Sequence, residues 1–201
     1  MSAISPQELE KLLSIDEEIR RCELCPLWKS RTKAVPGSGL KQKGVLMFVG
    51  EGPGRNEDLT GEPFVGRGGK LLDGFLDGAG IKRSQVFVTN VVKCRPPENR
   101  KPLPEEVRTC TSNFLERQIE ILEPKLICTL GATAMEYFTG EKKIGSFRGK
   151  VTKAKNGYSI YPLYHPASAL RNKTHKATLE KDVMKIPKVL KRLKRSPKLS
   201  A

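Results

Sequence analysis

A stretch with seven glycines directly follows a short apolar run, and this pairing limits the folds open to the chain. The apolar run covers residues 45–49 and the glycines fall within residues 50–69. Glycine lets a backbone turn sharply and approach a ligand closely. In open α/β sheets, the loops after the carboxyl ends of strands bind ligands. The simpler alternative is a long surface loop, but such loops are uncommon in compact domains unless they are functional. We therefore expect residues 50–69 to belong to a binding site.

The glycine pattern does not match the common phosphate-binding motifs. Leu71 follows Lys70 where a P-loop has the Ser or Thr that reaches magnesium. Gly50 and Gly52 fit the first two glycines of a dinucleotide fingerprint, but Arg55 stands in place of the third. The sequence therefore does not support a nucleotide cofactor.

The rest of the chain alternates between apolar runs and amphipathic segments. Ser5 caps a first helix that begins at Pro6 and ends near Arg21. Strands are expected at residues 45–49, 86–92, 126–130, 151–154 and 159–163. Further helices are expected at residues 70–76, 104–122 and 132–138 and in a basic amphipathic segment at the C-terminus. Residues 29–43 have the composition of an exposed basic loop.

This alternation predicts a three-layer α/β/α sandwich with a mostly parallel central sheet. The sequence contains no repeat and no composition shift that marks a domain boundary. We therefore expect residues 1–201 to form a single domain that ends in a basic helix and tail.

The formal net charge of +15 favours a polyanionic partner, most often nucleic acid. The alternative is a basic protein with a solvated lysine tail, since part of the excess lies in residues 181–198. No apolar run approaches the ~18 residues that span a bilayer. The first residues lack the basic start and apolar core of a signal peptide. We expect a cytoplasmic protein that does not enter a membrane.

Four of the five cysteines have the positions of metal ligands. Cys22 and Cys25 form a C-x2-C pair, whereas Cys94 and Cys110 lie in separate segments. Cys128 lies within an apolar strand and is expected to be a small buried side chain. Structural zinc sites usually bring a second close pair, while iron–sulfur clusters accept four thiolates at freer spacing. The spacing leaves both kinds of centre open, and unrelated free thiols are the third alternative.

Only two histidines are present, and one of them follows a predicted strand. His165 falls at the carboxyl end of residues 159–163, at the sheet edge where Glu51 and Asn90 are also expected. This position makes it a candidate catalytic residue as well as a structural one. His175 lies in a polar run and is expected to be a solvent-facing loop residue.

Taken together, these motifs make the chain resemble the family-4 uracil-DNA glycosylases, the iron–sulfur type found in archaea and bacteria. The matching segments are Cys22 with Cys25, residues 50–54, 61–67 and 90–97, Cys110, residues 130–134 and residues 165–167. The resemblance implies a [4Fe–4S] cluster on Cys22, Cys25, Cys94 and Cys110. It also implies hydrolysis of the N-glycosidic bond of uracil in DNA, which leaves an abasic site.

The resemblance assigns roles to the residues at the predicted sheet edge. Phe64 stacks on a uracil that has been flipped out of the helix, and the amide of Asn90 pairs with its N3–H and O4. His165 donates a hydrogen bond to the negative charge that develops at O2. Glu51 positions the attacking water, or alternatively bonds loop amides. Two further residues are assigned to the base pocket, namely Gly52 through its backbone amide and Glu57 as a barrier to the 5-methyl group of thymine.

Contacts to DNA are assigned to basic residues and to the segment after His165. The family often has a bulky residue four positions past the histidine, but this chain has Ala169 there and Leu170 next, so Leu170 is the candidate wedge. The expected DNA contacts are Lys93, Arg95, Arg100, Lys101, Arg148, Ser168, Leu170 and Arg171. We expect uracil-containing DNA, single- or double-stranded, as the partner of a monomer, with a sliding clamp as a candidate protein partner.

Three other classes of protein share some of these features. A non-catalytic nucleic-acid-binding module with zinc or a cluster explains the charge and cysteines, but not Asn90, Phe64 and His165 together. An electron-transfer protein explains only a cluster. A glycosylase with broader base preference, for example for hypoxanthine or for thymine opposite guanine, would have a sequence too similar to that of a uracil-specific enzyme for the two to be told apart.

Overall fold

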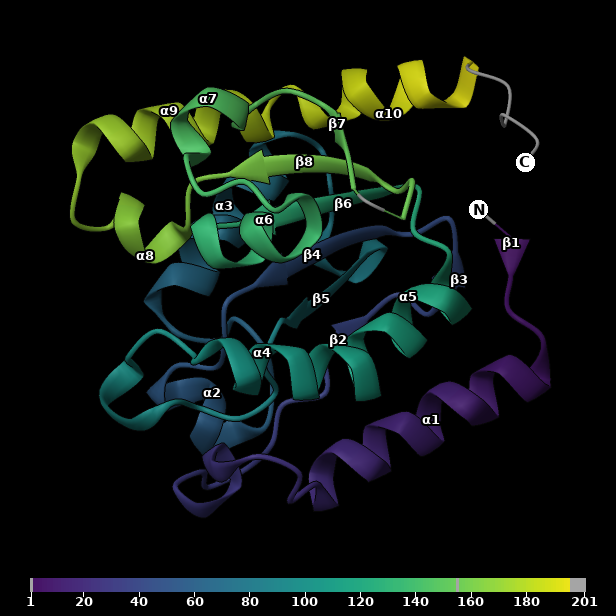
Figure 1. Cartoon of the computed structure of the whole chain (residues 1–201). Helices are drawn as coiled ribbons and strands as arrows, with labels where there is room; N and C mark the ends of the chain where they lie inside the picture. The colour runs from purple at the N-terminus through teal and green to yellow at the C-terminus, as the bar shows by residue number, and fades with distance from the viewer. Residues whose placement is uncertain (1, 155, 196–201) are drawn as a thin grey trace.

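A six-stranded sheet forms the centre of the fold in the computed structural model, which describes residues 2–154 and 156–195 (Figure 1). Its strand order is β2-β5-β4-β6-β8-β7. The strands are β2 (Ser38–Gly39), β4 (Leu46–Gly50), β5 (Val86–Asn90), β6 (Leu126–Leu130), β7 (Thr152–Lys153) and β8 (Ser159–Leu163). The four inner strands pair in parallel, while β2 and β7 pair antiparallel at the two edges. The predicted mostly parallel sheet is therefore confirmed.

Helices cover both faces of this sheet (Figure 1). Successive side chains of a strand point to opposite faces, so Met47 and Val49 pack in one core cluster and Phe48 in the other. The first cluster includes residues of α1 (Pro6–Arg21), α4 (Pro104–Cys110), α5 (Glu116–Leu122) and α6 (Ala132–Thr139). The second includes residues of α3 (Arg67–Gly78), α8 (Pro166–Ala169), α9 (Lys173–Val183) and α10 (Ile186–Arg195). This arrangement confirms the predicted three-layer α/β/α sandwich.

The first helix begins and ends where the sequence predicts. The hydroxyl of Ser5 accepts from the amide of Glu8, whose carboxylate accepts from the amide of Ser5, so the capping box is complete. The helix ends at Arg21, just before the first cysteine. Ahead of it, β1 (Ser2–Ala3) pairs with β3 (Gln42–Lys43) in a separate two-stranded sheet.

Two predicted segments differ from the structure near the glycine stretch. That stretch contains a helix of its own, α2 (Arg55–Thr60), and α3 begins at Arg67 rather than at residue 70. Residues 29–43 are not an exposed loop throughout, because Ala34, Val35 and Pro36 are buried. The amide of Val35 donates to the carbonyl of Lys93 at 2.8 Å, so this segment is tied to the loop after β5.

The predicted helix over residues 104–122 is interrupted by a π-helical turn, η4 (Thr111–Leu115), directly after Cys110. π-helical turns are rare in proteins, and those that occur are often found at functional sites. The other short elements are η1 (Pro26–Lys29), η2 (Arg83–Gln85), η3 (Pro97–Asn99) and α7 (Ile144–Phe147).

The C-terminal helix α10 is amphipathic, as predicted, and packs Ile186, Val189, Leu190 and Leu193 against the second core cluster. Residues 196–201 of the predicted basic tail lie outside the described residues. Within residues 2–154 and 156–195, no helix is both long enough and apolar enough to cross a membrane.

Candidate functional site

The loops that follow the parallel strands meet at one edge of the sheet and bring the predicted residues together. Gly50 and Asn90 are paired partners at the ends of β4 and β5. Gly131 follows β6, and His165 lies two residues past the end of β8. The rings of Phe64 and His165 are 6.0 Å apart between centroids. The structure therefore brings Phe64, Asn90 and His165 close together at this edge.

Asn90 is the most informative residue of this site. Its side chain is 1% exposed, and its Oδ1 has no hydrogen-bond partner among the residues that the structure describes. A buried carbonyl oxygen without a partner costs about 1–3 kcal/mol, so native proteins keep few of them. A Cβ added at Gly50 would lie 2.4 Å from this oxygen and 2.6 Å from the Phe64 ring. Only glycine therefore fits at position 50, because any side chain would collide with the Asn90 amide and the Phe64 ring.

Phe64 is held in an unusual backbone conformation with φ of 59°. Positive φ is uncommon for residues other than glycine and costs of order 1 kcal/mol or more. Two contacts fix the loop around it. A Cβ at Gly69 would lie 1.6 Å from the Phe64 carbonyl oxygen, so the next helix can approach only with glycine there. Arg83 donates to the carbonyl of Pro63 at 3.2 Å.

His165 is neutral in the folded protein, and its hydrogen bond fixes where the proton lies. Burial, helped by the positive charge of Arg171 and opposed by Glu57, lowers the pKa of His165 to about 4. Its Nδ1 accepts a hydrogen bond from the amide of Ala167 at 3.1 Å. A neutral imidazole that accepts at Nδ1 carries its proton on Nε2. His165 can therefore donate a hydrogen bond from Nε2 at physiological pH.

The two acidic residues of the loop have different hydrogen-bond partners. Glu51 Oε2 accepts from the hydroxyl of Thr133, a buried residue at the start of α6, at 2.5 Å. Glu57 accepts from the amides of Gly54 at 3.1 Å and Gly66 at 2.8 Å, and so joins the two ends of the loop. Glu57 therefore holds the loop that carries Phe64, whatever contact it makes with a base.

Gly52 lies on the same loop, next to the segment that follows β5. A Cβ at this position would lie 2.8 Å from Val92. Its backbone therefore approaches the Asn90 loop closely, where any side chain would be crowded.

The four cysteines predicted to bind a metal line one cavity, together with apolar residues of α1 and the π turn. Three of their sulfurs accept hydrogen bonds: Cys22 from the Leu24 amide, Cys94 from the Arg31 guanidinium and Cys110 from the Lys93 amide. The fifth, Cys128, is fully buried in β6, as predicted. In the described part of the chain, no group of three or more His, Cys, Asp or Glu side chains is arranged to hold a metal ion.

Burial raises the pKa of the Cys110 thiol to about 12 and also raises the pKa values of Cys25 and Cys94. Burial alone thus favours neutral thiols in this cavity. Thiolate ligands would need the positive charge of a bound metal group, together with the N–H donors around them.

Lys93 does not contact phosphate, contrary to the prediction from its basic surroundings. The residue is 1% exposed, and its ammonium donates to Thr89 Oγ1, the Asn90 carbonyl and Gln118 Oε1. Burial lowers the pKa of Lys93 to about 8. Two of these acceptors lie only three and four residues before Lys93, while Gln118 is 25 residues away, and the basic run around Lys93 reveals none of them.

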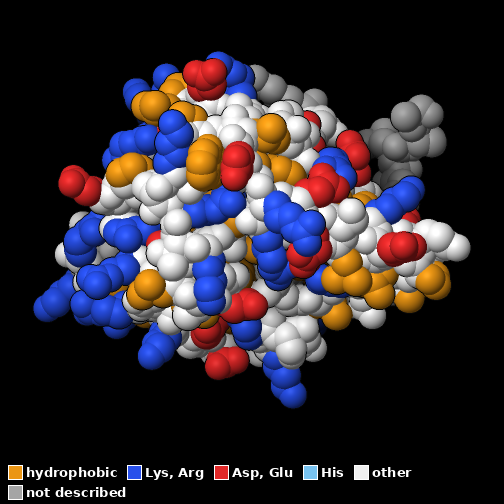
Figure 2. Space-filling model, turned by 90° about the horizontal axis from the view of Figure 1, so that it is seen from below, with side chains coloured by type: hydrophobic (Ala, Val, Ile, Leu, Met, Phe, Trp, Pro, Cys, Tyr) orange, Lys and Arg blue, Asp and Glu red, His pale blue; other side chains and the backbone are white. Residues whose placement is uncertain are grey.

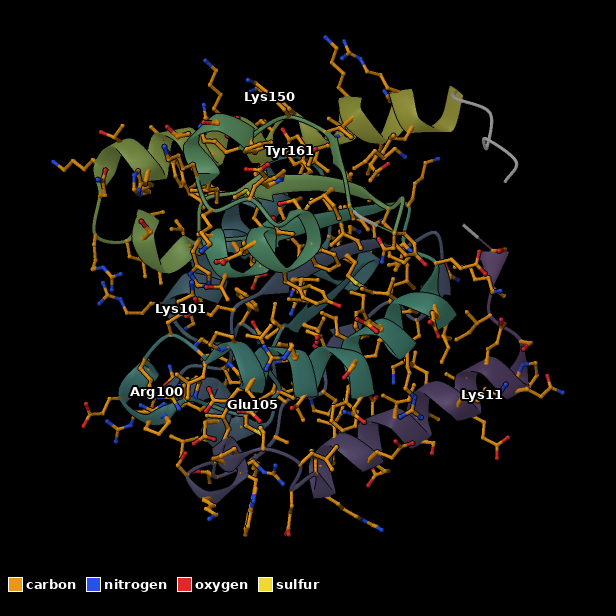
Figure 3. All side chains as sticks on the ribbon, in the orientation of Figure 1. Lys11, Arg100, Lys101, Glu105, Lys150 and Tyr161 are labelled. Atoms are coloured by element: carbon orange, nitrogen blue, oxygen red, sulfur yellow. The ribbon has the colours of Figure 1, made fainter. Side chains whose placement is uncertain are left out.

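The other predicted DNA contacts lie on the surface, several of them within ion pairs. Arg100 pairs with Glu106, Lys101 with Glu136 and Arg148 with Asp182. Arg100 and Lys101 project from the loop before α4, on the side to which the β8 arrow points (Figures 1 and 3). Figure 2 shows Lys and Arg side chains gathered toward the same side of the molecule.

The segment after His165 differs in part from expectation. Leu170 is 40% exposed while Ala169 is buried, so Leu170 is the residue able to reach a partner. His175 does not lie in a loop: it belongs to α9, stacks on Tyr164 at 4.1 Å between ring centroids, and bonds Ser168 at 2.6 Å.

Sequence reasoning missed two functional neighbours. Thr133 lies in the matched segment 130–134, but nothing in that motif indicates that it bonds Glu51, which follows the neighbouring strand β4. Arg31 lies in the segment 29–43 that is expected to be an exposed basic loop, yet its guanidinium bonds the Cys94 sulfur at 3.2 Å and the Cys22 carbonyl at 2.6 Å. Both contacts depend on the tertiary fold.

Comparison with known proteins gives a consistent result. The sequence model of the Uracil DNA glycosylase superfamily matches residues 37–190. A Type-4 uracil-DNA glycosylase of Sulfurisphaera tokodaii is 48% identical over 89% of this chain and 84% of its own length. The Type-4 enzymes of Saccharolobus solfataricus and Thermotoga maritima are 44% and 45% identical over 90% and 84% of this chain, and 88% and 87% of their own lengths.

Proposed function

Because this chain belongs to the uracil-DNA glycosylase superfamily, on its Type-4 branch, we propose that it hydrolyses the N-glycosidic bond between uracil and deoxyribose in DNA. The product is an abasic site, so the enzyme acts in base excision repair. The observation that carries this proposal is the buried, unpartnered Oδ1 of Asn90, which lies beside Gly50, with the Phe64 ring also against that glycine. This oxygen is already out of contact with water in the free protein, so it can accept a hydrogen bond from the N3–H of a flipped base without first losing a bound water.

Recognition of uracil follows from the donor and acceptor pattern of the site. A glycosylase must extrude the base from the helix, which costs least when uracil is mispaired or in a single strand. Phe64 then stacks on the base, while Asn90 accepts from N3–H and donates to O4. Cytosine has no proton on N3 and an amino group at position 4, so it leaves the buried amide unpaired. Such mismatches reject the wrong base strongly.

Bond cleavage leaves an oxocarbenium-like sugar and a uracil anion. His165, neutral and protonated at Nε2, donates to O2 as negative charge develops there, which is an oxyanion-hole role. Glu51, held by Thr133, orients the water that attacks C1′. The Gly52 amide bonds the base, and Glu57 crowds the 5-position while its carboxylate holds the loop together.

The test is cleavage of labelled oligonucleotides that carry one uracil, thymine, cytosine or hypoxanthine. We expect alkali-sensitive breakage at uracil alone. Breakage at hypoxanthine, or at thymine opposite guanine, would instead establish the broader base preference. Binding without breakage at any base would identify the non-catalytic binding module and contradict the proposal.

We further propose that Cys22, Cys25, Cys94 and Cys110 hold a [4Fe–4S] cluster. The cavity that they share and the N–H donors to three of their sulfurs support this assignment. When bound, the cluster would tie α1 to the loop after Asn90 and to the start of the π turn, which is a structural contribution.

Cys22→Ala is expected to lose iron and thermal stability while affecting uracil chemistry only indirectly. Removing one of four thiolates weakens a centre whose binding energy is also folding energy. Iron content, visible absorbance and Tm measure the effect. Cys128→Ala is the matched control, because Cys128 lies outside this cavity and should leave iron content unchanged. Full iron content and an unchanged Tm in Cys22→Ala would contradict the assignment.

DNA affinity is expected to fall steeply with salt, because phosphate contacts release counterions. We propose Arg95, Arg100, Lys101, Arg148, Ser168, Leu170 and Arg171 as the DNA-contacting residues, with Leu170 as the wedge. Arg171→Ala should reduce the slope of log affinity against log salt by about 1. Lys11→Ala, on the outer side of α1, is the control and should leave this slope unchanged. Equal slopes for the two variants would show that Arg171 is not one of the DNA-contacting residues.

We also propose that the chain acts as a single domain and as a monomer in the cytoplasm. A sliding clamp stays a candidate partner. Size-exclusion chromatography with light scattering measures the oligomeric state directly, and a dimer mass would contradict the monomer.

A further inference from the structure

The ammonium group of Lys93 uses all three of its protons inside the protein. It donates to Thr89 Oγ1 at 2.5 Å, to the Asn90 carbonyl at 3.0 Å and to Gln118 Oε1 at 2.8 Å. All three acceptors are neutral, and the residues described include no carboxylate in an ion pair with Lys93. Burying a cation is costly unless it is both paired with an opposite charge and hydrogen-bonded. Lys93 has the hydrogen bonds but no carboxylate in an ion pair among the described residues, which raises the question of what role its position serves.

The hydrogen bonds around Lys93 join the base pocket to the cysteine-lined cavity. Its own amide donates to the Cys110 sulfur at 3.2 Å. Gln118 lies two helical turns after Cys110, and its Nε2 donates to the carbonyl of Pro36 at 3.1 Å. The amide of Val35 donates back to the Lys93 carbonyl at 2.8 Å. Lys93 is therefore the centre of a closed network that spans three separate segments of the chain.

One of these bonds acts on the residue that the site depends on. Asn90 presents a buried side-chain oxygen that has no hydrogen-bond partner among the described residues. Its backbone, by contrast, is fixed on both sides: the amide of the next residue, Val91, donates to the Gly50 carbonyl at 2.9 Å, and Lys93 binds the Asn90 carbonyl. The orientation of the Asn90 side chain is thus set through its backbone.

We propose that Lys93 is a positioning residue for base recognition, which fixes Asn90 against the helix that carries Cys110 so that its amide is aimed at the flipped base. The inference rests on the base-reading role proposed for Asn90. It predicts that loss of the ammonium weakens binding of uracil itself more than binding of the DNA backbone. Preorganised sites lose affinity when a supporting hydrogen bond is removed, even though the ligand does not touch the mutated residue.

The test is Lys93→Met, which keeps a similar side-chain length and removes every donor. The primary readout is the inhibition constant of free uracil, because it does not depend on what fraction of the enzyme is active. We expect this constant to rise roughly tenfold, as for loss of one hydrogen bond to a charged group. Affinity for an abasic oligonucleotide, which has no base to read, should stay within about twofold. Iron content and Tm are measured on the same samples.

Lys11→Met is the matched control, since it makes the same chemical change on the exposed side of α1, at the far side of the molecule from Arg100 and Lys101 (Figure 3). It should change neither constant. If Lys93→Met does not fold, Gln118→Leu decides the question in its place. That variant removes one acceptor of the ammonium, and we expect a smaller rise in the uracil constant with the abasic-DNA affinity again retained.

Two results would overturn the proposal. An unchanged uracil constant would show that Lys93 does not position Asn90. Equal loss of affinity for uracil and for abasic DNA would show that Lys93 supports the fold in general. Failure of the proposed function is recognised separately, because the wild-type protein would then neither release uracil from DNA nor be inhibited by it.

Discussion

Asn90→Leu is expected to abolish uracil excision without lowering the stability of the protein. Leucine has nearly the shape of asparagine but offers neither the acceptor for N3–H nor the donor for O4. A site built to hydrogen-bond its substrate loses discrimination of about 10⁴ or more when those bonds cannot form, so we expect kcat/KM to fall by at least about 10³-fold. Single-turnover cleavage of a uracil oligonucleotide measures this loss.

The stability side of the prediction comes from the unpartnered Oδ1. In the free protein, this buried oxygen destabilises the fold by about 1–3 kcal/mol, and leucine removes that cost. Tm should therefore stay constant or rise, as expected where function and stability oppose each other. Thr129→Val is the matched control, because Thr129 Oγ1 on β6 is also buried and has no partner among the described residues. It should likewise not lower Tm, but it should leave cleavage within a few-fold.

Two outcomes would contradict this account of Asn90. A large drop in Tm for Asn90→Leu would mean that the amide has a structural partner. Substantial uracil cleavage by the variant would mean that the base is read elsewhere.

The sequence was sufficient to predict the sheet and the edge at which the site lies. Parallel strands read as uninterrupted apolar runs, and the carboxyl ends of such strands meet at one edge. Gly50 and His165 follow runs of this kind, so their convergence could be expected from local pattern alone. The sequence predicts Asn90 inside a strand over residues 86–92, whereas β5 ends at Asn90, so its place at the edge is sharper in the structure than in the prediction.

What could not be predicted depends on contacts between distant segments. Lys93 lies in a basic run whose composition predicts an exposed segment. It is buried because the fold places Thr89 and Gln118 where they accept hydrogen bonds from its ammonium group. The left-handed backbone of Phe64 is held by Gly69 and by the Glu57 bonds across the loop, which no propensity of phenylalanine indicates. In each case tertiary hydrogen bonds or close packing overrode local preference.

His165→Ala is expected to lower the single-turnover rate of uracil excision by about 10²–10³-fold, the usual loss for one oxyanion donor. Substrate affinity should change less, because the hydrogen bond to O2 strengthens as charge develops. His175→Ala serves as the control: its side chain bonds Ser168 and stacks on Tyr164, so it can affect DNA affinity, but the rate of the chemical step should stay within a few-fold. Equal rate losses in both variants would contradict a specific role for His165.

The pH dependence provides an independent check on the protonation state of this residue. The pKa of His165 is about 4 in the folded protein and near 6.5 when unfolded. Between about pH 4 and pH 6.5 the unfolded state binds a proton at this imidazole that the folded state does not. The contribution of neutral His165 to the free energy of unfolding is therefore complete above about pH 6.5 and is lost as the pH falls toward 4. The free energy of unfolding should therefore fall by up to about 1.4 kcal/mol per pH unit in this window, and less steeply in His165→Ala.

Catalysis should follow the same ionisation. The pH dependence of kcat/KM reports the pKa values of the free enzyme. Because His165 ionises only near pH 4, it should cause no change in kcat/KM between pH 5.5 and 8. A step in kcat/KM near pH 6.5 that disappears in His165→Ala would show instead that the imidazole is solvated and ordinary. The neutral Nε2–H donor would then have to be replaced by a cationic one in the mechanism.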